Sequence, residues 1–253
     1  MELLKDFVEE RGFIWSSWRR YFHHHPEKAG KETETLYFIK GLLEDMNLDF
    51  EEYDDTCIVN ISGSEPGFTY LFETNLEAQE QVEKAKVPYR SKEYGLMHAL
   101  GNDVKTTILL GICDYFSDHN LPKGKVKCVF RNNYNRKEKN SPNKNIPSDF
   151  IFQVSVNPKM LPEEILIYYE NLKKSEFEKS VEDLNKIWPY LTIRFKNSKT
   201  TDELSTLSSK ITLDLGCGFP DKENPPLGDS KFEVNEDCIP IGVFLGLGMI
   251  IEG

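Results

Sequence analysis

The stretch from Gly95 to Thr107 reads GLMHALGNDVKTT and contains the clearest boundary signal in the chain. Two glycines and an Asn-Asp pair mark a turn, after which apolar residues recur every three or four positions. Asp103 is of a residue type that commonly caps the first turn of a helix. We therefore predict a helix that begins at Asp103 and continues through Leu110 to Tyr115.

Helix and strand patterns alternate on both sides of this turn. The helices predicted from amphipathic spacing span residues 3–25, 36–46, 177–188, 202–210 and 239–251. The runs predicted as strands span residues 48–53, 57–62, 68–72, 126–130, 150–156, 190–195 and 211–215. Residues 131–149 contain almost nothing apolar and indicate a long surface loop. Alternation of this kind is typical of the α/β class.

The composition and net charge of the chain argue against nucleic-acid and membrane partners. The chain has 253 residues, a size that suits one large α/β domain, and a net charge of −11 that repels nucleic acid. No apolar run approaches the ~20 residues of a membrane span, so we expect no membrane association. The five cysteines form no Cys-x-x-Cys pair, and the acidic start does not resemble a secretory signal. We expect a cytoplasmic protein with reduced thiols.

Several blocks resemble the metal-dependent aminoacylase and hippurate hydrolase family, zinc metallopeptidase relatives that hydrolyse N-acyl amino acids. Residues 95–107 are similar, without a gap, to that family's G-V-M-H-A-C-G-H-D-G-H-T-A. Residues 19–32, 73–78 and 214–218 resemble R-x-L-H-x-H-P-E-L-x-x-x-E, R-A-D-M-D-A and F-L-G-x-G, in the same order. The resemblance implies a three-layer domain over residues 1–253, with a central mixed sheet flanked by helices.

The same resemblance implies that the family's lid and dimerisation domain is absent. Residues 159–199 stand where that domain is inserted, and they are too few to form an independent domain. We therefore expect a short replacement for the lid, and no dimer of the kind that the lid mediates.

The ligand positions of the family's metal pair are altered. In the family, His, Cys and carboxylate side chains hold two divalent metals that activate water. By the resemblance, the five ligands and the catalytic base fall on Leu100, Asn102, Tyr134, Asn135, Ser155 and Gly228. A leucine has no lone pair to donate, and a neutral amide is a poor zinc ligand. We expect no metal, no cofactor and no catalytic residue of the family type.

The remaining cleft residues are expected to be vestigial. They comprise Asn75, Glu77, His98, Asp103 and Lys105. We interpret His98 as a hydrogen-bonded structural imidazole and Asp103 as a helix cap. Lys105 lies two residues beyond Asp103, where its charge would neutralise that acidity and replace a bound cation by a fixed one.

Other groups have simple structural interpretations. Consecutive histidines face different directions on a helix, so His23 and His25 are expected to pack and cap the helix end. The acidic cluster is expected to form a solvated rim, and comprises Glu73, Glu77, Glu80 and Glu83. Cys217 is expected to be buried and inert.

Three hypotheses follow for function. In the first, the chain is a catalytically inactive homologue that binds a peptide-like or acyl-amino-acid ligand, or a protein partner. In the second, it is a hydrolase whose rewired site uses Asp103, Lys105, Glu77 and Tyr134 as acid, base and electrophile. In the third, it is a structural subunit of a larger complex.

Overall fold

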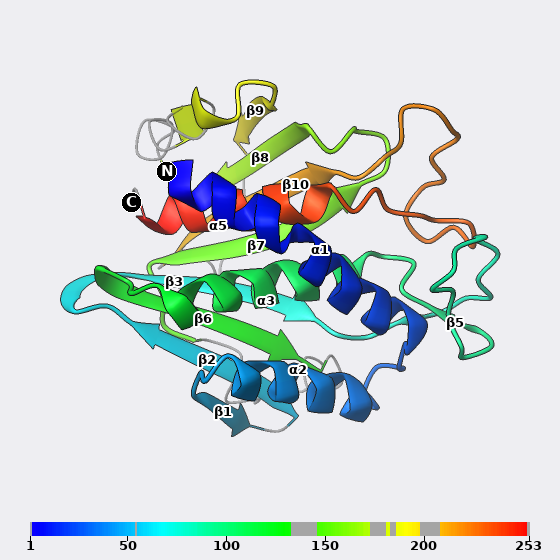
Figure 1. Cartoon of the computed structure of the whole chain (residues 1–253), viewed down its shortest axis with the longest axis horizontal. Coiled ribbons are helices and arrows are strands. Elements are labelled where there is room, and N and C mark those ends of the chain that lie inside the picture. Colours follow the sequence, from blue (N-terminus) through cyan, green and yellow to red (C-terminus); the bar gives the residue numbers. More distant parts are fainter. Residues whose placement is uncertain are drawn as a thin grey trace.

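The computed structural model describes residues 2–53, 55–132, 146–172, 181–182, 186–197 and 208–251 (Figure 1). The long helices in this part of the chain are α1 (Glu2–His24), α2 (Thr33–Asp45), α3 (Asn102–Asp118) and α5 (Cys238–Ile251). The first strands are β1 (Phe50–Tyr53), β2 (Thr56–Ser62), β3 (Glu65–Asn75), β4 (Gln79–Glu80) and β5 (Leu96–Met97). The later strands are β6 (Lys123–Arg131), β7 (Phe150–Asn157), β8 (Glu164–Glu170), β9 (Thr192–Asn197) and β10 (Ser209–Gly216).

Eight strands form one mixed sheet in the order β1-β2-β6-β3-β7-β10-β8-β9. The four central strands, β6, β3, β7 and β10, run parallel to one another, whereas β2 and β8 pair antiparallel with them on either side. Parallel strands end at the same edge of a sheet, and ligand sites of α/β folds lie at that edge. Here this edge carries Asn75, Arg131, Asn157 and Gly216, the last residues of the four strands.

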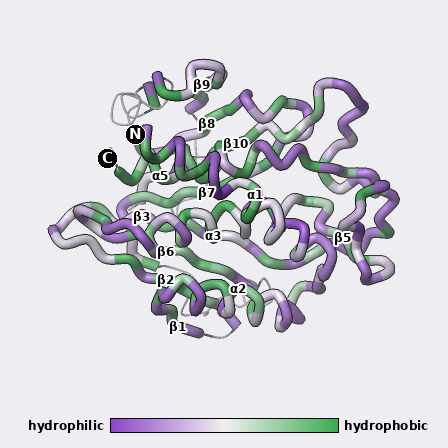
Figure 2. The backbone as a smooth tube through the Cα atoms, viewed as in Figure 1, coloured by the Kyte–Doolittle hydropathy of each residue, from purple (hydrophilic) through white to green (hydrophobic). Residues whose placement is uncertain are grey.

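Three helices, α1, α3 and α5, pack against one another over one face of the sheet (Figure 1). Side chains alternate between faces along a strand, so Cys128 and Phe130 of β6 join the core beneath these helices. Val129, between them, belongs to a smaller apolar cluster on the opposite face. Figure 2 shows the apolar residues gathered in the central strands and in α5. The predicted α/β fold with a mixed sheet flanked by helices is confirmed.

Small residues bring α3 and α5 together closely. A Cβ added at Gly111 of α3 would lie 2.5 Å from Val243 of α5, and one at Gly242 would lie 2.6 Å from Ile108. Glycine is a weak helix former, yet α5 is helical and almost wholly buried, because tertiary packing outweighs intrinsic propensity.

Most predicted elements are present, with ends shifted by a few residues. The described parts of residues 159–199 include β8 and β9, which extend the main sheet, and the replacement of a lid domain by this segment stays a prediction. Residues 133–145 of the loop predicted at 131–149, and most of the predicted helices at 177–188 and 202–210, lie outside the described residues. None of the helices in the described ranges is both long and apolar enough to cross a membrane.

Candidate ligand site

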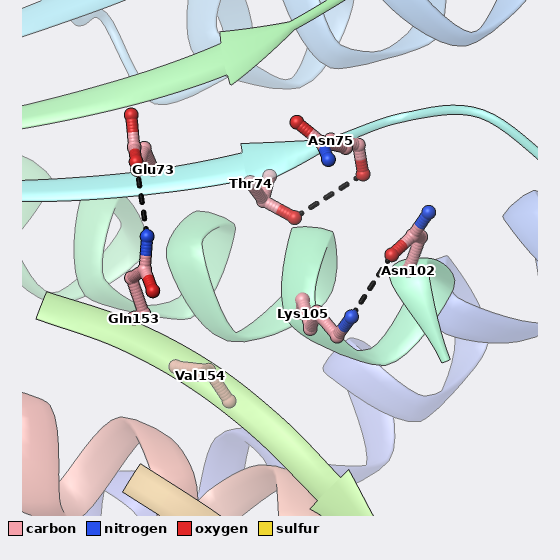
Figure 3. Close-up of a pocket in the computed structure, with 7 residues that line it drawn as sticks. All are labelled: Glu73, Thr74, Asn75, Asn102, Lys105, Gln153 and Val154. Carbon is pink, nitrogen blue, oxygen red and sulfur yellow. Dashed lines mark hydrogen bonds between the residues drawn. The ribbon is translucent and has the colours of Figure 1, made fainter. Parts of the chain in front are cut away.

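A cavity of about 190 Å³ lies between the end of β3, the middle of β7 and the first turn of α3 (Figure 3). Its lining consists of Glu73, Thr74, Asn75, Asn102, Lys105, Gln153 and Val154. Three of the residues predicted for the old cleft, Asn75, Asn102 and Lys105, are therefore brought together from segments far apart in the sequence.

Hydrogen bonds fix the side chain of Asn102 at both ends. Its Nδ2 donates to the backbone oxygen of Glu77 at 2.8 Å, and its Oδ1 accepts from Lys105 Nζ at 3.0 Å. The side chains of Asn102 and Lys105 point toward one another in Figure 3. Burial lowers the pKa of Lys105, while the nearby charges of Glu77 and Asp103 partly restore it. Asn102 thus forms a polar bridge between Lys105 and the backbone of Glu77.

Glu73 lines the cavity as part of a second polar group. Arg131 Nε lies 3.0 Å from its Oε2, and Gln153 Nε2 donates to its Oε1 at 3.2 Å. The carboxylate therefore has a cation and an amide as partners, and its charge is largely compensated within the protein.

The other predicted cleft residues lie apart from the cavity lining. Leu100 is 40% exposed, and its backbone N–H donates to Gln79 Oε1 at 3.0 Å. Gly228 donates its backbone N–H to the oxygen of Ala99 at 2.8 Å, and Ser155 lies along β7. Tyr134 and Asn135 lie outside the described residues.

The described lining does not suit a zinc pair. It offers amides, a hydroxyl, an aliphatic side chain and an ammonium, with Glu73 as its carboxylate. Across the ranges that the structure describes, no three His, Cys, Asp or Glu side chains are grouped so that they could hold a metal ion. Hard and borderline cations need several anionic or imidazole donors, so this donor set is a poor match.

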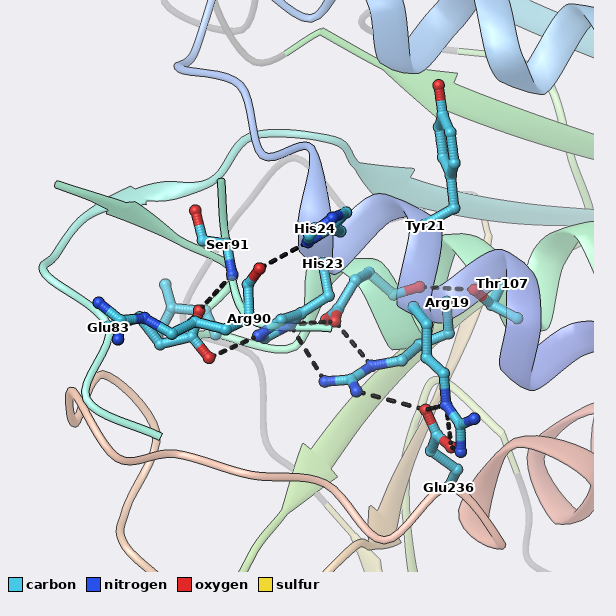
Figure 4. A network of polar contacts seen from close by, with 12 residues as sticks. Arg19, Tyr21, His23, His24, Glu83, Arg90, Ser91, Thr107 and Glu236 are labelled. Carbon is cyan, nitrogen blue, oxygen red and sulfur yellow. Dashed lines mark hydrogen bonds and ion pairs between the residues drawn. The ribbon is translucent and has the colours of Figure 1, made fainter. Parts of the chain in front are cut away.

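A buried ionic network lies behind the first turn of α3 (Figure 4). Arg19 Nε and His23 Nδ1, one helical turn apart on α1, each lie 2.8 Å from Asp103 Oδ2. His23 Nε2 lies 3.1 Å from Glu83 Oε1, and Arg19 Nη1 lies 3.4 Å from Glu236. The network therefore joins α1, α3 and two long connecting segments.

The charges in this network set one another's protonation. Burial alone would raise the pKa of Asp103, but the Arg19 charge and the His23 hydrogen bond hold that pKa well below its usual range. Burial and Arg19 lower the pKa of His23, yet its bonds to Asp103 and Glu83 outweigh them and raise it. An imidazolium at His23 donates one N–H to each carboxylate.

Two predictions about these residues are wrong. Asp103 is not the helix cap, because α3 begins at Asn102 after Gly101 and the Asp103 side chain pairs with Arg19 and His23. Glu83 is 3% exposed and not part of a solvated rim, although Glu80 is exposed as expected. Arg19 makes the direct ion pair with Asp103, and the charges of Lys105 and Asp103 also interact.

His23 is a network residue rather than a packing residue, whereas His25 does bond the carbonyl oxygen of Tyr21 at the helix end, at 2.9 Å. The Arg-x-x-x-His spacing on one face of α1 was a usable signal for the network. Cys217 is fully buried, as expected, and burial raises the pKa of its thiol to about 12.

His98 differs from the expected hydrogen-bonded imidazole. Its side chain is buried, and neither ring nitrogen has a hydrogen-bond partner among the residues that the structure describes. Burial lowers the pKa of His98 to about 4, with the charges of His23, Arg19 and Lys105 opposing that of Asp103. The imidazole is therefore neutral near pH 7 and carries no charge into the network.

This pKa predicts a specific loss of stability in acid. The unfolded chain binds a proton at His98 near pH 6.5, whereas the native protein does so only near pH 4. Between those values the unfolded state binds more protons, so the wild type should lose about 3 kcal/mol relative to a His98→Asn variant. Urea unfolding of both proteins from pH 8 to pH 4 measures this difference, and the pH 8 value corrects for altered packing. A constant difference across the range would contradict the prediction.

Comparison with known proteins defines the class to which this fold belongs. No protein-family model matches the chain. Among solved structures, the YXEP protein of Bacillus subtilis, a dinuclear metal binding peptidase from the M20 family, superposes with a TM-score of 0.73 at 13% identity, over 96% of this chain and 98% of that one. A leucine aminopeptidase precursor from Bacteroides thetaiotaomicron gives a TM-score of 0.56 at 12% identity, over 96% of each chain. The fold is that of the zinc peptidases.

Part of the chain is also similar in sequence to curated enzymes. The chain is 32% identical over 146 residues to N-acetyldiaminopimelate deacetylase of Lactobacillus helveticus, covering 55% of this chain and 37% of that protein. The Limosilactobacillus fermentum deacetylase is 35% identical over 119 residues, covering 45% of this chain and 31% of that protein. The chain thus matches about a third of the length of these curated relatives. Over that part it is similar to these deacetylases, and its fold is that of the B. subtilis peptidase from the M20 family.

Proposed function

We propose that this chain is a metal-independent binding homologue of the M20 amidohydrolases, retaining their scaffold without their hydrolytic reaction. Its ligand would be a small molecule related to the acyl-amino-acid or peptide-like substrates of such enzymes. The observation that carries the proposal is the bridge between Lys105 Nζ and Asn102 Oδ1. By the resemblance in sequence, Asn102 stands where the metal-dependent enzymes have a ligating histidine.

The electrostatics of the cavity support this proposal. A metal cation bound there would face the Lys105 ammonium, and like charges in a partly buried site repel strongly. Asn102, the nearest replacement for a ligand, already uses both ends of its carboxamide within the protein. Binding a cation would therefore require breaking existing hydrogen bonds and displacing a charge.

Metal analysis together with an activity assay tests the proposal. Protein purified without chelators should contain far less than one zinc per chain by inductively coupled plasma mass spectrometry. It should also release no acetate from N-acetyldiaminopimelate, the substrate named for its curated relatives, with or without added zinc, manganese or cobalt. The B. subtilis M20 peptidase, purified in parallel, is the control for metal retention.

Stoichiometric zinc together with metal-dependent acetate release would contradict the proposal. Acetate release that survives chelation and is lost in Lys105→Met would instead favour the rewired hydrolase. Lys105 is the specific reason to keep that second candidate, because it places an ammonium in the lining of a cavity.

A further inference from the structure

The cavity beside α3 contains a cation of its own. Lys105 is partly buried in the first turn of α3, and its Nζ contributes to the lining. We propose that this cavity binds the carboxylate group of a small organic acid, and that Lys105 is the residue that recognises it. This inference rests on the proposed function, since it requires the cavity to be free of metal.

Lys105 retains donor capacity for a ligand. An ammonium carries three N–H donors, and Asn102 Oδ1 accepts one of them at 3.0 Å. The bond to Asn102 also orients the lysine side chain, so less conformational entropy is lost when a ligand binds. Charge-assisted hydrogen bonds from an ammonium to a carboxylate are among the stronger polar contacts in proteins.

Two of the carboxylates near the cavity are already paired within the protein. Glu73 is the carboxylate of the lining, and both its oxygens already have partners in Arg131 and Gln153. Asp103 is directed to Arg19 and His23 in the network behind the helix. The negative charge of Glu77 raises the pKa of Lys105, which helps to keep the lysine protonated in the absence of ligand.

Two further features of the lining suit carboxylate oxygens. The cavity lies at the start of α3, a helix of 17 residues whose N-terminus carries partial positive charge. Asn75, at the end of β3, adds a carboxamide that can donate to a second oxygen. The ammonium, the helix start and an amide thus surround the same space (Figure 3).

The volume guides the choice of a probe. At about 190 Å³ the cavity has room for more than a single water molecule. A short-chain acid of about five or six non-hydrogen atoms fills such a space, whereas a peptide would have to extend beyond it. Propanoate is therefore a suitable probe, and propanamide is its uncharged counterpart of nearly the same shape.

Ligand-observed NMR titration, with EDTA present, compares the two probes on the wild type and three variants. Propanoate should bind the wild type more tightly than propanamide. Lys105→Met, which keeps the length of the side chain, should weaken propanoate binding about ten- to a hundredfold and weaken propanamide binding much less, because the amide loses a hydrogen bond but no ion pair. Lys105→Arg should retain a preference for propanoate. Lys84→Met alters an exposed lysine beside a separate open depression and should bind propanoate as the wild type does.

Wild-type protein offers a second measurement that needs no variant. Saturating propanoate should slow the reductive methylation of Lys105, followed by peptide mass spectrometry, and should leave Lys84 unaffected. Equal affinity for the two probes, equal affinity of wild type and Lys105→Met, or no protection of Lys105 would each overturn the inference while leaving the metal-free proposal intact. Binding of propanoate that requires added zinc would overturn both.

Discussion

Replacing Asp103 with asparagine is expected to lower the free energy of unfolding by about 3–5 kcal/mol. The substitution keeps the shape of the side chain but removes the negative charge between Arg19 and His23. Arg19 is 1% exposed, so its guanidinium cannot turn to water for compensation. Urea unfolding at pH 7, followed by circular dichroism, measures the loss.

Glu80→Gln is the matched control for this experiment. Glu80 also pairs with a cation, Lys28, at 2.7 Å, but that pair is exposed to solvent and should contribute little. The urea midpoint of Glu80→Gln should therefore equal that of the wild type. If Asp103→Asn lowered the free energy of unfolding by less than about 1 kcal/mol, the buried charges of Arg19 and His23 would not depend on Asp103 for their stability.

The acid dependence of Asp103 has a definite sign. Its pKa is held below the value near 3.9 of an unfolded aspartate, so its contribution is fully present above that pH and is lost as the pH falls further. His98 acts at higher pH, between about 6.5 and 4. The two groups therefore weaken the protein in successive ranges of pH, which variants at each position can separate.

The local signals in the sequence predict the elements well. The stretch from Gly95 to Thr107 predicts the start of α3 to within one residue, because a turn glycine and apolar periodicity are read over a few neighbouring positions. The same stretch assigns Asp103 to the wrong role. Its partner His23 lies 80 positions earlier in the chain, and only the packing of α1 against α3 brings the two together.

The residues that line the cavity were also predicted only in part from the sequence. The resemblance to the amidohydrolases places Asn75, Asn102 and Lys105 near one another, and the structure confirms that these residues share a cavity. Glu73 and Gln153 are absent from the predicted cleft, because their contact depends on the pairing of β3 with β7. Gln153 and Ser155 lie on the same face of β7, so the alternation of side chains along the strand could not have separated them.

Replacing Gly216 with alanine is expected to destabilise the protein by at least about 3 kcal/mol. A Cβ at this position would lie 1.7 Å from the carbonyl oxygen of Leu161 and 2.9 Å from that of Glu164. Both are backbone atoms: Leu161 lies in the turn that precedes β8, and Glu164 is the first residue of β8. Glu164 N donates to that same Leu161 oxygen at 2.8 Å. Relief of the clash would therefore move the start of β8 away from β10.

Gly41→Ala separates this steric effect from the general cost of removing a glycine. Gly41 lies inside α2, and an added Cβ would meet no atom within 4 Å. Alanine there should stabilise the protein by about 0.5–1 kcal/mol, because it favours the helix and restricts the unfolded chain. Opposite signs for the two substitutions, measured by the same urea unfolding, would locate the constraint in the contact between β10 and the turn before β8. If Gly216→Ala did not destabilise the protein, β10 and the turn before β8 could not be as close together as they are in the structure.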